Sequence, residues 1–93
     1  MEHLTAEDRA QFLAGHPEWQ LEGETISRTF VFDDFVEAIG FVNKVAIGAE
    51  VADHHPDIDI RWNKVTLALS THSEGALTAK DTALAAKADG YAA

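Results

Sequence analysis

The side chains best suited to acid–base chemistry in this chain are three histidines and two carboxylates, all in its second half. His54 and His55 are adjacent, His72 follows further along, and Glu50 and Asp81 flank the set. Imidazole titrates near neutral pH, so it can both donate and accept a proton during a reaction. Because the sequence contains no cysteine, disulfides, thiolate nucleophiles and cysteine-based metal sites are excluded. The remaining chemistry is that of imidazole and carboxylate groups.

The surroundings of the adjacent histidines favour a protonated imidazole. Glu50 precedes His54 by four residues, a spacing that places two side chains on one helix face. A helix C-terminus also carries partial negative charge, whereas burial of the ring would oppose its protonation. Three further carboxylates crowd this part of the sequence: Asp53, Asp57 and Asp59. We therefore expect a histidine here that holds a proton near neutral pH, as a general acid must.

Each of these residues also has a structural interpretation that involves no chemistry. A lone histidine at a helix C-terminus often only complements the helix dipole, and Asp81 fits a Thr-x-x-Asp capping box. Glu50 would then be an ion-pair partner of His54, and Trp62 would fill the core. The histidines could instead hold a metal ion, but the ligand spacings typical of zinc sites are missing from the sequence, so we predict no metal site. Two more histidines are expected at the surface: His3 and His16.

The elements that must position these residues begin with a helix and a hairpin. A capping box at residues 5–8 and a terminating Gly15 predict a short first helix. The next segment alternates polar and apolar residues around a turn at residues 22–24. This alternation predicts a β-hairpin over residues 19–32. Its apolar face would carry Ile26, Phe30 and Phe32.

The strongest helix pattern runs from residue 35 to residue 53 or 54, and Pro56 must end it. Two adjacent apolar stripes run along this helix, and together they are too wide for a single packing seam. The first stripe contains Phe35, Ile39, Val42, Ala46 and Ala49. The second contains Ala38, Phe41, Val45, Gly48 and Ala52. Gly40 and Gly48 each weaken a helix by roughly 1 kcal/mol relative to alanine, which is best tolerated where another backbone approaches closely. We therefore expect burial against the sheet and against a neighbouring subunit, with close packing inside one subunit as the alternative.

Two further strands are expected after this helix. Residues 57–62 alternate as a strand with Trp62 on its apolar face, and residues 63–64 turn the chain. Residues 65–71 then form a last strand, with His72 closing its polar face. This arrangement places His72 at a strand end, a location where functional side chains are commonly presented.

A second capping box, at residues 78–81, opens a final helix that Gly90 is expected to end. The element order is helix, two strands, helix, two strands, helix. Because hairpins favour antiparallel pairing, we predict an α+β fold with a four-stranded, mainly antiparallel sheet and helices packed on one face. A chain of 93 residues has room for one core, so residues 1–93 are expected to form a single domain.

The composition restricts the partners of this protein. Seven Lys and Arg against sixteen Asp and Glu give a formal net charge of −9, which excludes a nucleic-acid partner because phosphate binding needs clustered positive charge. No apolar stretch reaches the roughly 20 residues of a membrane helix, and the N-terminal residues lack the pattern of a signal peptide. We therefore expect a soluble, unexported protein of the cytoplasm that does not bind membranes.

The joint spacing of the candidate residues resembles the signature of the pterin-4a-carbinolamine dehydratases. That signature consists of an acidic residue, His-His-Pro, an aromatic residue, a third histidine and an aspartate. The matching residues in this chain are Glu50, His54, His55, Pro56, Trp62, His72 and Asp81. The passage from Thr71 to Asp81 also resembles the family's Thr-His, Gly-Gly-Leu-Thr and Asp passage, except that Ala76 replaces the second glycine.

The resemblance implies the dehydration of a 4a-hydroxytetrahydropterin to a quinonoid dihydropterin and water, without a cofactor. It implies that His54 and His72 are the acid–base groups. It further implies that Asp81 orients His72 and that Glu50 acts on His54. His55 would belong to the catalytic group while mainly binding substrate. The implied substrate-binding residues are His55, Glu50, Pro56 and Trp62.

The resemblance also implies a homodimer or homotetramer and a place in tetrahydrobiopterin recycling, linked to an aromatic amino acid hydroxylase. A rival interpretation keeps the scaffold without the catalysis, because some relatives act as dimerisation cofactors or assembly factors. Retention of the histidines in this sequence favours an enzyme over such a partner protein. A third interpretation is a metal-binding stress protein.

Overall fold

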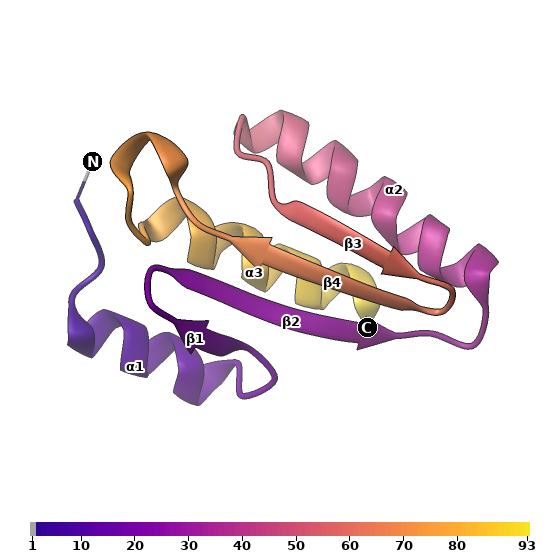
Figure 1. Cartoon of the computed structure of the whole chain (residues 1–93), viewed down its shortest axis with the longest axis horizontal. Coiled ribbons are helices and arrows are strands. Elements are labelled where there is room, and N and C mark those ends of the chain that lie inside the picture. Colours follow the sequence, from indigo (N-terminus) through magenta and orange to yellow (C-terminus); the bar gives the residue numbers. More distant parts are fainter. Residues whose placement is uncertain (1) are drawn as a thin grey trace.

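The computed structural model describes residues 2–93, which form three α-helices and one four-stranded sheet (Figure 1). The elements are α1 (Ala6–Gly15), β1 (Gln20–Glu22), β2 (Thr25–Val31), α2 (Phe35–Ala52), β3 (Asp57–Arg61), β4 (Lys64–Leu69) and α3 (Ala79–Ala92). A short 3-10 turn, η1 (His72–Glu74), lies between β4 and α3. The predicted order of helices and strands is confirmed.

The four strands pair antiparallel in the order β1-β2-β4-β3. The register sets Phe30 of β2 opposite Val65 of β4, and Val65 opposite Ile60 of β3. Because side chains alternate along a strand, all three lie on the same face of the sheet. The helices cover this face, and Figure 1 shows α3 passing behind β2 and β4. The other face exposes residues such as Thr29 and Lys64 to solvent.

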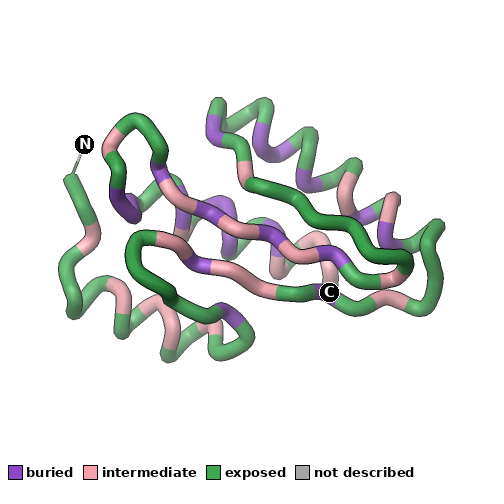
Figure 2. The backbone as a smooth tube through the Cα atoms, in the orientation of Figure 1, coloured by how far each residue is buried: buried purple, intermediate pink, exposed green. Residues whose placement is uncertain are grey.

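One hydrophobic core lies between the sheet and the helices. It joins β2 and β4 to α2 and α3, as the purple segments in Figure 2 show. Its buried side chains from these elements are Ile26, Phe30, Val65, Leu67, Leu69, Ala38, Phe41, Val45, Ala49, Leu84, Ala85 and Ala88. Helix α1 has no buried residue, and only Phe12 and Leu13 pack against the edge of the core. The element order and the core together confirm the predicted α+β fold.

Helix α2 begins and ends close to its predicted limits. Asp34 caps it by accepting a hydrogen bond from the Glu37 N–H at 2.8 Å. Asp53 ends it in the left-handed conformation, with φ 51°, and Pro56 keeps His55 out of helical geometry. Neither α2 nor any other helix within residues 2–93 has the length and apolarity to cross a membrane.

The two apolar stripes of α2 are buried to different extents. Ala38, Phe41 and Val45 of the second stripe are buried, whereas Phe35 of the first is 51% exposed. Three other apolar side chains on α2 are largely exposed: Val36, Ile47 and Val51. We call these three residues the exposed stripe of α2. The single chain therefore leaves part of the apolar surface of α2 uncovered.

The two glycines of α2 have different surroundings. A Cβ added at Gly48 would lie 2.5 Å from the Tyr91 hydroxyl oxygen, whereas one added at Gly40 would meet nothing within 4 Å. The expected close approach is therefore found at Gly48, where the approaching group is a side chain of α3 rather than a backbone. At Gly40 no such approach is made by residues 2–93, and an approach by a neighbouring subunit stays a prediction.

Strand β4 and the turn before it differ from the sequence predictions. The turn between β3 and β4 contains Trp62 and Asn63, one residue earlier than predicted. Trp62 adopts φ 53° there and is 66% exposed, so it neither extends β3 nor fills the core. Strand β4 ends at Leu69, because the N–H of Thr71 instead donates to the carbonyl of Ala76 at 3.0 Å and closes a loop.

The loop that closes on Thr71 contains η1, which also moves His72 from its predicted place. His72 is the first residue of η1 rather than the end of a strand. Helix α3 also continues through Gly90 to Ala92. No proline or left-handed residue interrupts it there, and glycine alone weakens a helix without ending it.

The entry to α3 is fixed by residues from the beginning of the chain. Leu4 donates its N–H to the carbonyl of Leu77 at 2.9 Å. Glu24, in the turn between β1 and β2, accepts the Leu77 N–H at 3.0 Å and binds the Arg9 guanidinium through both carboxylate oxygens. The Arg9 hydrogen bonds and the Leu77 N–H lower the pKa of Glu24 to about 2. Residues remote in sequence therefore hold the segment that precedes Thr78.

Candidate active site

Three histidines from two separate loops line one cleft. His54 and His55 follow the end of α2, and His72 opens η1 after β4. The cleft has a volume of about 250 Å³. Its lining residues are Asp53, His54, His55, Ser70, Thr71, His72, Ser73 and Lys80. The fold therefore brings together the three histidines that the sequence analysis selected.

The buried member of this group is His54, which is held by Asp81. His54 is 8% exposed and Asp81 is completely buried. The His54 Nε2 and Asp81 Oδ1 atoms lie 2.5 Å apart. The other carboxylate oxygen, Oδ2, accepts the Thr71 hydroxyl at 2.8 Å and the Thr78 N–H at 2.9 Å. A buried carboxylate is stabilised by hydrogen bonds to both oxygens, and here it has them.

The predicted partner of Asp81 was wrong. Asp81 binds His54, not His72, because the chain turns at the end of β4 so that Thr71 faces the buried carboxylate. His72, one residue later, is exposed in the cleft. The capping role predicted for Asp81 is confirmed, since it closes a capping box with Thr78 at the start of α3.

The predicted partner of Glu50 was also wrong. Its carboxylate contacts the Nε2 atom of His55 rather than His54. The left-handed Asp53 turns the chain out of the helix, so the i, i+4 geometry does not extend to His54. Both partners are more than half exposed, with side chains at 57% for His55 and 77% for Glu50. Solvent screens such a pair, so it contributes little to stability.

Two predicted substrate contacts lie outside the lining of this cleft. Pro56 is not a lining residue, and Trp62 lies at the far end of β3. Five strand residues span roughly 17 Å at the usual rise. Within one chain, Trp62 is therefore separated from the histidines by the length of a strand.

Several lining residues were not selected from the sequence. Lys80 lies in the first turn of α3 and lines the cleft. The sequence feature that could have indicated it is its position next to Asp81, inside the capping box. Thr71 was noted only as part of a family-like passage, although it contacts Asp81 directly. Ser70 and Ser73 flank His72, and no local pattern distinguishes them from ordinary loop serines.

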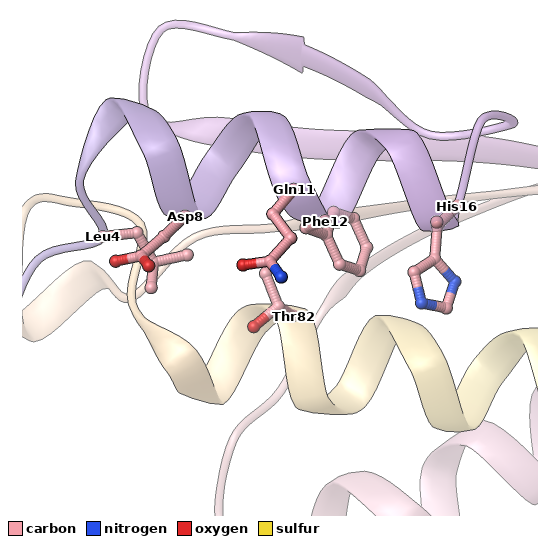
Figure 3. A pocket seen from close by; sticks show the side chains of 7 residues that line it. Leu4, Asp8, Gln11, Phe12, His16 and Thr82 are labelled. Carbon is pink, nitrogen blue, oxygen red and sulfur yellow. The ribbon is translucent and has the colours of Figure 1, made fainter.

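A larger groove lies elsewhere, between α1 and α3 (Figure 3). Its volume is about 410 Å³, and its walls include Phe12, His16 and Thr82. The Nδ1 atom of His16 lies 2.8 Å from Asp89, which also accepts hydrogen bonds from Trp19 and Arg28. His16 is thus partly buried and paired rather than simply on the surface, and these contacts tie α1 to α3. Only one histidine reaches this groove, so it lacks the convergence of acid–base groups seen in the smaller cleft.

The cleft can both supply and remove protons. In a neutral imidazole one nitrogen carries the hydrogen and the other carries the lone pair. Since Nε2 of His54 faces the Asp81 carboxylate, the hydrogen belongs on Nε2 and the lone pair on Nδ1. His55 and His72 provide two more imidazoles in the same cleft. Among residues 2–93, no three histidine, aspartate or glutamate side chains are grouped as metal ligands would be.

A family model described as pterin 4 alpha carbinolamine dehydratase matches residues 2–91. The chain belongs to this family. Among pterin-4a-carbinolamine dehydratase relatives, a protein of Chloroflexus aurantiacus is 54% identical over 89 residues and covers 96% of both chains. A protein of Mycobacteroides abscessus is 51% identical over 86 residues, with 92% of both chains covered. Both are named "Putative pterin-4-alpha-carbinolamine dehydratase", and a dehydratase of this kind is a hydro-lyase.

Two solved structures share the dehydratase fold. One is described as a transcriptional coactivator/pterin dehydratase from Brucella melitensis. It has a TM-score of 0.95 and 36% identity, and the match covers 99% of this chain and 100% of the other. The second is a pterin dehydratase-like protein described as a RuBisCO assembly factor in the alpha-carboxysome. Its TM-score is 0.66 at 23% identity, over 80% of this chain and 86% of the other, so it shows the fold alone.

Proposed function

We propose that this chain removes water from a 4a-hydroxytetrahydropterin and gives a quinonoid dihydropterin. The observation that carries this proposal is the cleft in which three imidazoles meet, one of them bound to a buried carboxylate. Family membership supplies the substrate class. The bond between C4a and the hydroxyl oxygen breaks, one proton goes to the departing hydroxyl, and one proton leaves a ring nitrogen. No electron transfer is needed.

His54 and His72 are the proposed acid–base groups, and His55 mainly binds the pterin. His54 is fixed in orientation by Asp81, while His72 is exposed in the cleft. A positioned imidazole contributes typically 10²- to 10⁴-fold to a proton-transfer step. One histidine protonates the departing hydroxyl and the other takes the ring proton, so each ends in the other protonation state and water restores both.

A stopped-flow dehydration assay, with the spontaneous reaction as its baseline, tests this function. We expect the wild-type chain to exceed the spontaneous rate, and His54→Ala and His72→Ala each to lower turnover roughly 10²-fold or more. His3→Ala is the matched control, because His3 is an exposed histidine outside the cleft. Wild-type rates at the spontaneous level would contradict the proposed function. Full activity in a folded His72→Ala variant would contradict the role of His72.

Self-association accompanies this function in our proposal, as a homodimer or homotetramer. The exposed stripe of α2 supports it, because Val36, Ile47 and Val51 are between 66% and 78% exposed. Apolar surface of this kind is stabilised when a partner removes it from water. Location in the cytoplasm and a functional link to an aromatic amino acid hydroxylase remain predictions from the sequence.

A second candidate function is that of a protein-assembly partner. The exposed stripe of α2 favours its consideration, because uncovered apolar surface of this kind fits a protein partner. Stoichiometric capture of one protein partner, combined with no pterin turnover, would favour this candidate over the enzyme. The intact set of cleft histidines supports the enzyme.

A further inference from the structure

We propose that Thr71, backed by Thr78, is a positioning residue that holds the Asp81 carboxylate so that His54 keeps a single ring tautomer. Only the kinetic part of this inference rests on the proposed function. The tautomer of His54 is a property of the free protein and can be measured without substrate. The inference concerns two hydroxyl groups that lie behind the cleft histidine rather than the histidine itself.

The geometry behind this inference is a short buried chain of hydrogen bonds. The Thr71 and Thr78 hydroxyl oxygens lie 2.7 Å apart, and the Thr71 oxygen lies 2.8 Å from Asp81 Oδ2. Thr71 is 5% exposed, and Thr78 and Asp81 are completely buried. Water is therefore excluded from these groups, and the direction of each hydrogen bond is set by the protein alone.

The number of available hydrogens fixes the donor and the acceptor in each of these hydrogen bonds. An ionised carboxylate has no hydrogen to donate, so the Thr71 hydroxyl must donate to Asp81. A hydroxyl has one hydrogen, so Thr71 can only accept at its contact with Thr78, and Thr78 must donate there. The Thr78 oxygen in turn accepts the N–H of Lys80 at 3.3 Å. Both hydroxyl hydrogens in this series of hydrogen bonds, those of Thr78 and Thr71, therefore point toward Asp81.

This ordered chain determines what Asp81 presents to the cleft. Its Oδ2 atom is occupied by two donors, Thr71 and the N–H of Thr78, so the carboxylate cannot turn without losing both. The Oδ1 atom is left as an acceptor beside Nε2 of His54. An acceptor at that place requires the hydrogen on Nε2, which leaves the lone pair of a neutral His54 on Nδ1. Thr71 thus acts on the reaction through Asp81 and His54.

The test replaces the hydroxyl of Thr71 while keeping the shape of the side chain. Thr71→Val exchanges the hydroxyl for a methyl group, and Thr71→Ser keeps the hydroxyl without the methyl. The capping box remains in both, because the Thr78 N–H still reaches Asp81. The matched control is Thr66→Val, because Thr66 forms a hydroxyl pair with Thr29 at 2.8 Å on the exposed face of the sheet. That pair has no contact with Asp81.

Two readouts separate positioning from simple stability. Nitrogen-15 NMR of the imidazoles reports which ring nitrogen of His54 carries the hydrogen, at a pH where the ring is neutral. We expect one Nε2–H tautomer in wild type, Thr71→Ser and Thr66→Val, and a mixture in Thr71→Val. We also expect Thr71→Val to lower kcat about 10-fold or more, the usual effect of losing a hydrogen bond to a charged group, with KM changed less than about twofold.

The proposal and the proposed function fail in distinguishable ways. A folded Thr71→Val variant that keeps the single Nε2–H tautomer would overturn the positioning role, whatever its activity. Absent dehydration by the wild-type chain would overturn the proposed function and leave the tautomer result intact. Thermal melting shows whether each variant is folded. If valine does not fit, Thr71→Ala removes the hydroxyl without adding a methyl group in its place, and the same tautomer result decides.

Discussion

Asp81 is the side chain on which the fold and the cleft both depend. It closes the capping box that starts α3, and it holds the one buried histidine of the cleft. An ionised carboxylate has about four acceptor positions, and the contacts with His54, Thr71 and the Thr78 N–H use three of them. A change at Asp81 therefore alters the stability of α3 and the orientation of His54 together.

We predict that Asp81→Asn lowers turnover of a 4a-hydroxytetrahydropterin about 10²-fold and also lowers the melting temperature. An amide places NH₂ either toward His54 Nε2 or toward the two donors that now bind Oδ2, so one set of contacts is lost. Stopped-flow kinetics and thermal melting measure the two effects.

The matched control is Asp8→Asn, in the equivalent capping box of α1. That box is exposed and has no histidine partner. The control is expected to reduce stability by less than about 1 kcal/mol, because the asparagine oxygen still accepts the Thr5 N–H, and to leave turnover unchanged. Equal activity of Asp81→Asn and Asp8→Asn would contradict the catalytic importance of the Asp81 contact.

We predict that Glu24 makes the protein less stable as the pH falls from about 4.5 toward 2. Its pKa is about 2 in the folded chain, below the ordinary value of 4.5. A carboxyl with a lowered folded pKa contributes stability above the unfolded pKa and loses it as the pH falls through the folded pKa.

The comparison of wild type with Glu24→Gln tests this prediction. Urea unfolding at a series of pH values should show a smaller decrease between pH 4.5 and 2 for the variant than for wild type. The difference should be modest, because the Glu24 side chain is 44% exposed and solvent screens its pairing with Arg9. Parallel curves for the two proteins would contradict the assignment.

Local sequence predicted these residues better than it predicted their pairings. The capping boxes at Thr5 and Thr78 each follow from four consecutive residues, so the sequence alone predicts both. The partner of His54 depends on the left-handed Asp53 and on the turn at Thr71, which together bring His54 and Asp81 into contact. No spacing within one helix contains that information.

At the scale of elements, α2 is a helix whose two glycines have unlike surroundings. Gly48 faces the Tyr91 hydroxyl of α3, while Gly40 faces open space. Alanine at an exposed helix interior stabilises relative to glycine by about 0.5–1 kcal/mol. The same substitution at Gly48 would place a methyl group where Tyr91 now lies.

We therefore predict that Gly40→Ala raises the free energy of unfolding by about 0.5–1 kcal/mol, and that Gly48→Ala raises it less or lowers it. Urea unfolding of the two variants measures the difference. Repeating both substitutions with Tyr91→Ala is the control, because the two sites should then behave alike. A difference that persists without Tyr91 would mean that another contact restricts Gly48.

The ends of an element were predictable where a capping residue or a proline marks them. They were less predictable where the conformation of a turn sets the end of a strand. Helix α2 follows from Asp34 at its start and Pro56 beyond its end. Trp62 was placed on a strand because it continues an alternating pattern, yet it occupies a left-handed turn position. Alternation records side-chain polarity and not the sign of φ, so the pattern could not reveal this turn.

At the scale of the whole molecule, the exposed stripe of α2 predicts self-association. We expect Val51→Glu to shift the mass measured by light scattering toward that of a single chain. A charge in an apolar interface loses its hydration without gaining a partner. Val31→Glu is the matched control, because Val31 is a 62% exposed valine on the opposite face of the sheet. A monomeric wild-type protein would contradict this prediction.

Two long-range pairings, Leu4 with Leu77 and His54 with Asp81, can form only late in the synthesis of the chain. A nascent chain contains His54, His55 and His72 before it contains Lys80 and Asp81, which complete the cleft and hold His54. Until residue 81 has left the ribosome, His54 lacks the carboxylate that holds it. Leu4 likewise lacks the Leu77 carbonyl to which its N–H donates. A product truncated ahead of α3 would thus contain all three histidines of the cleft but lack the carboxylate that holds His54.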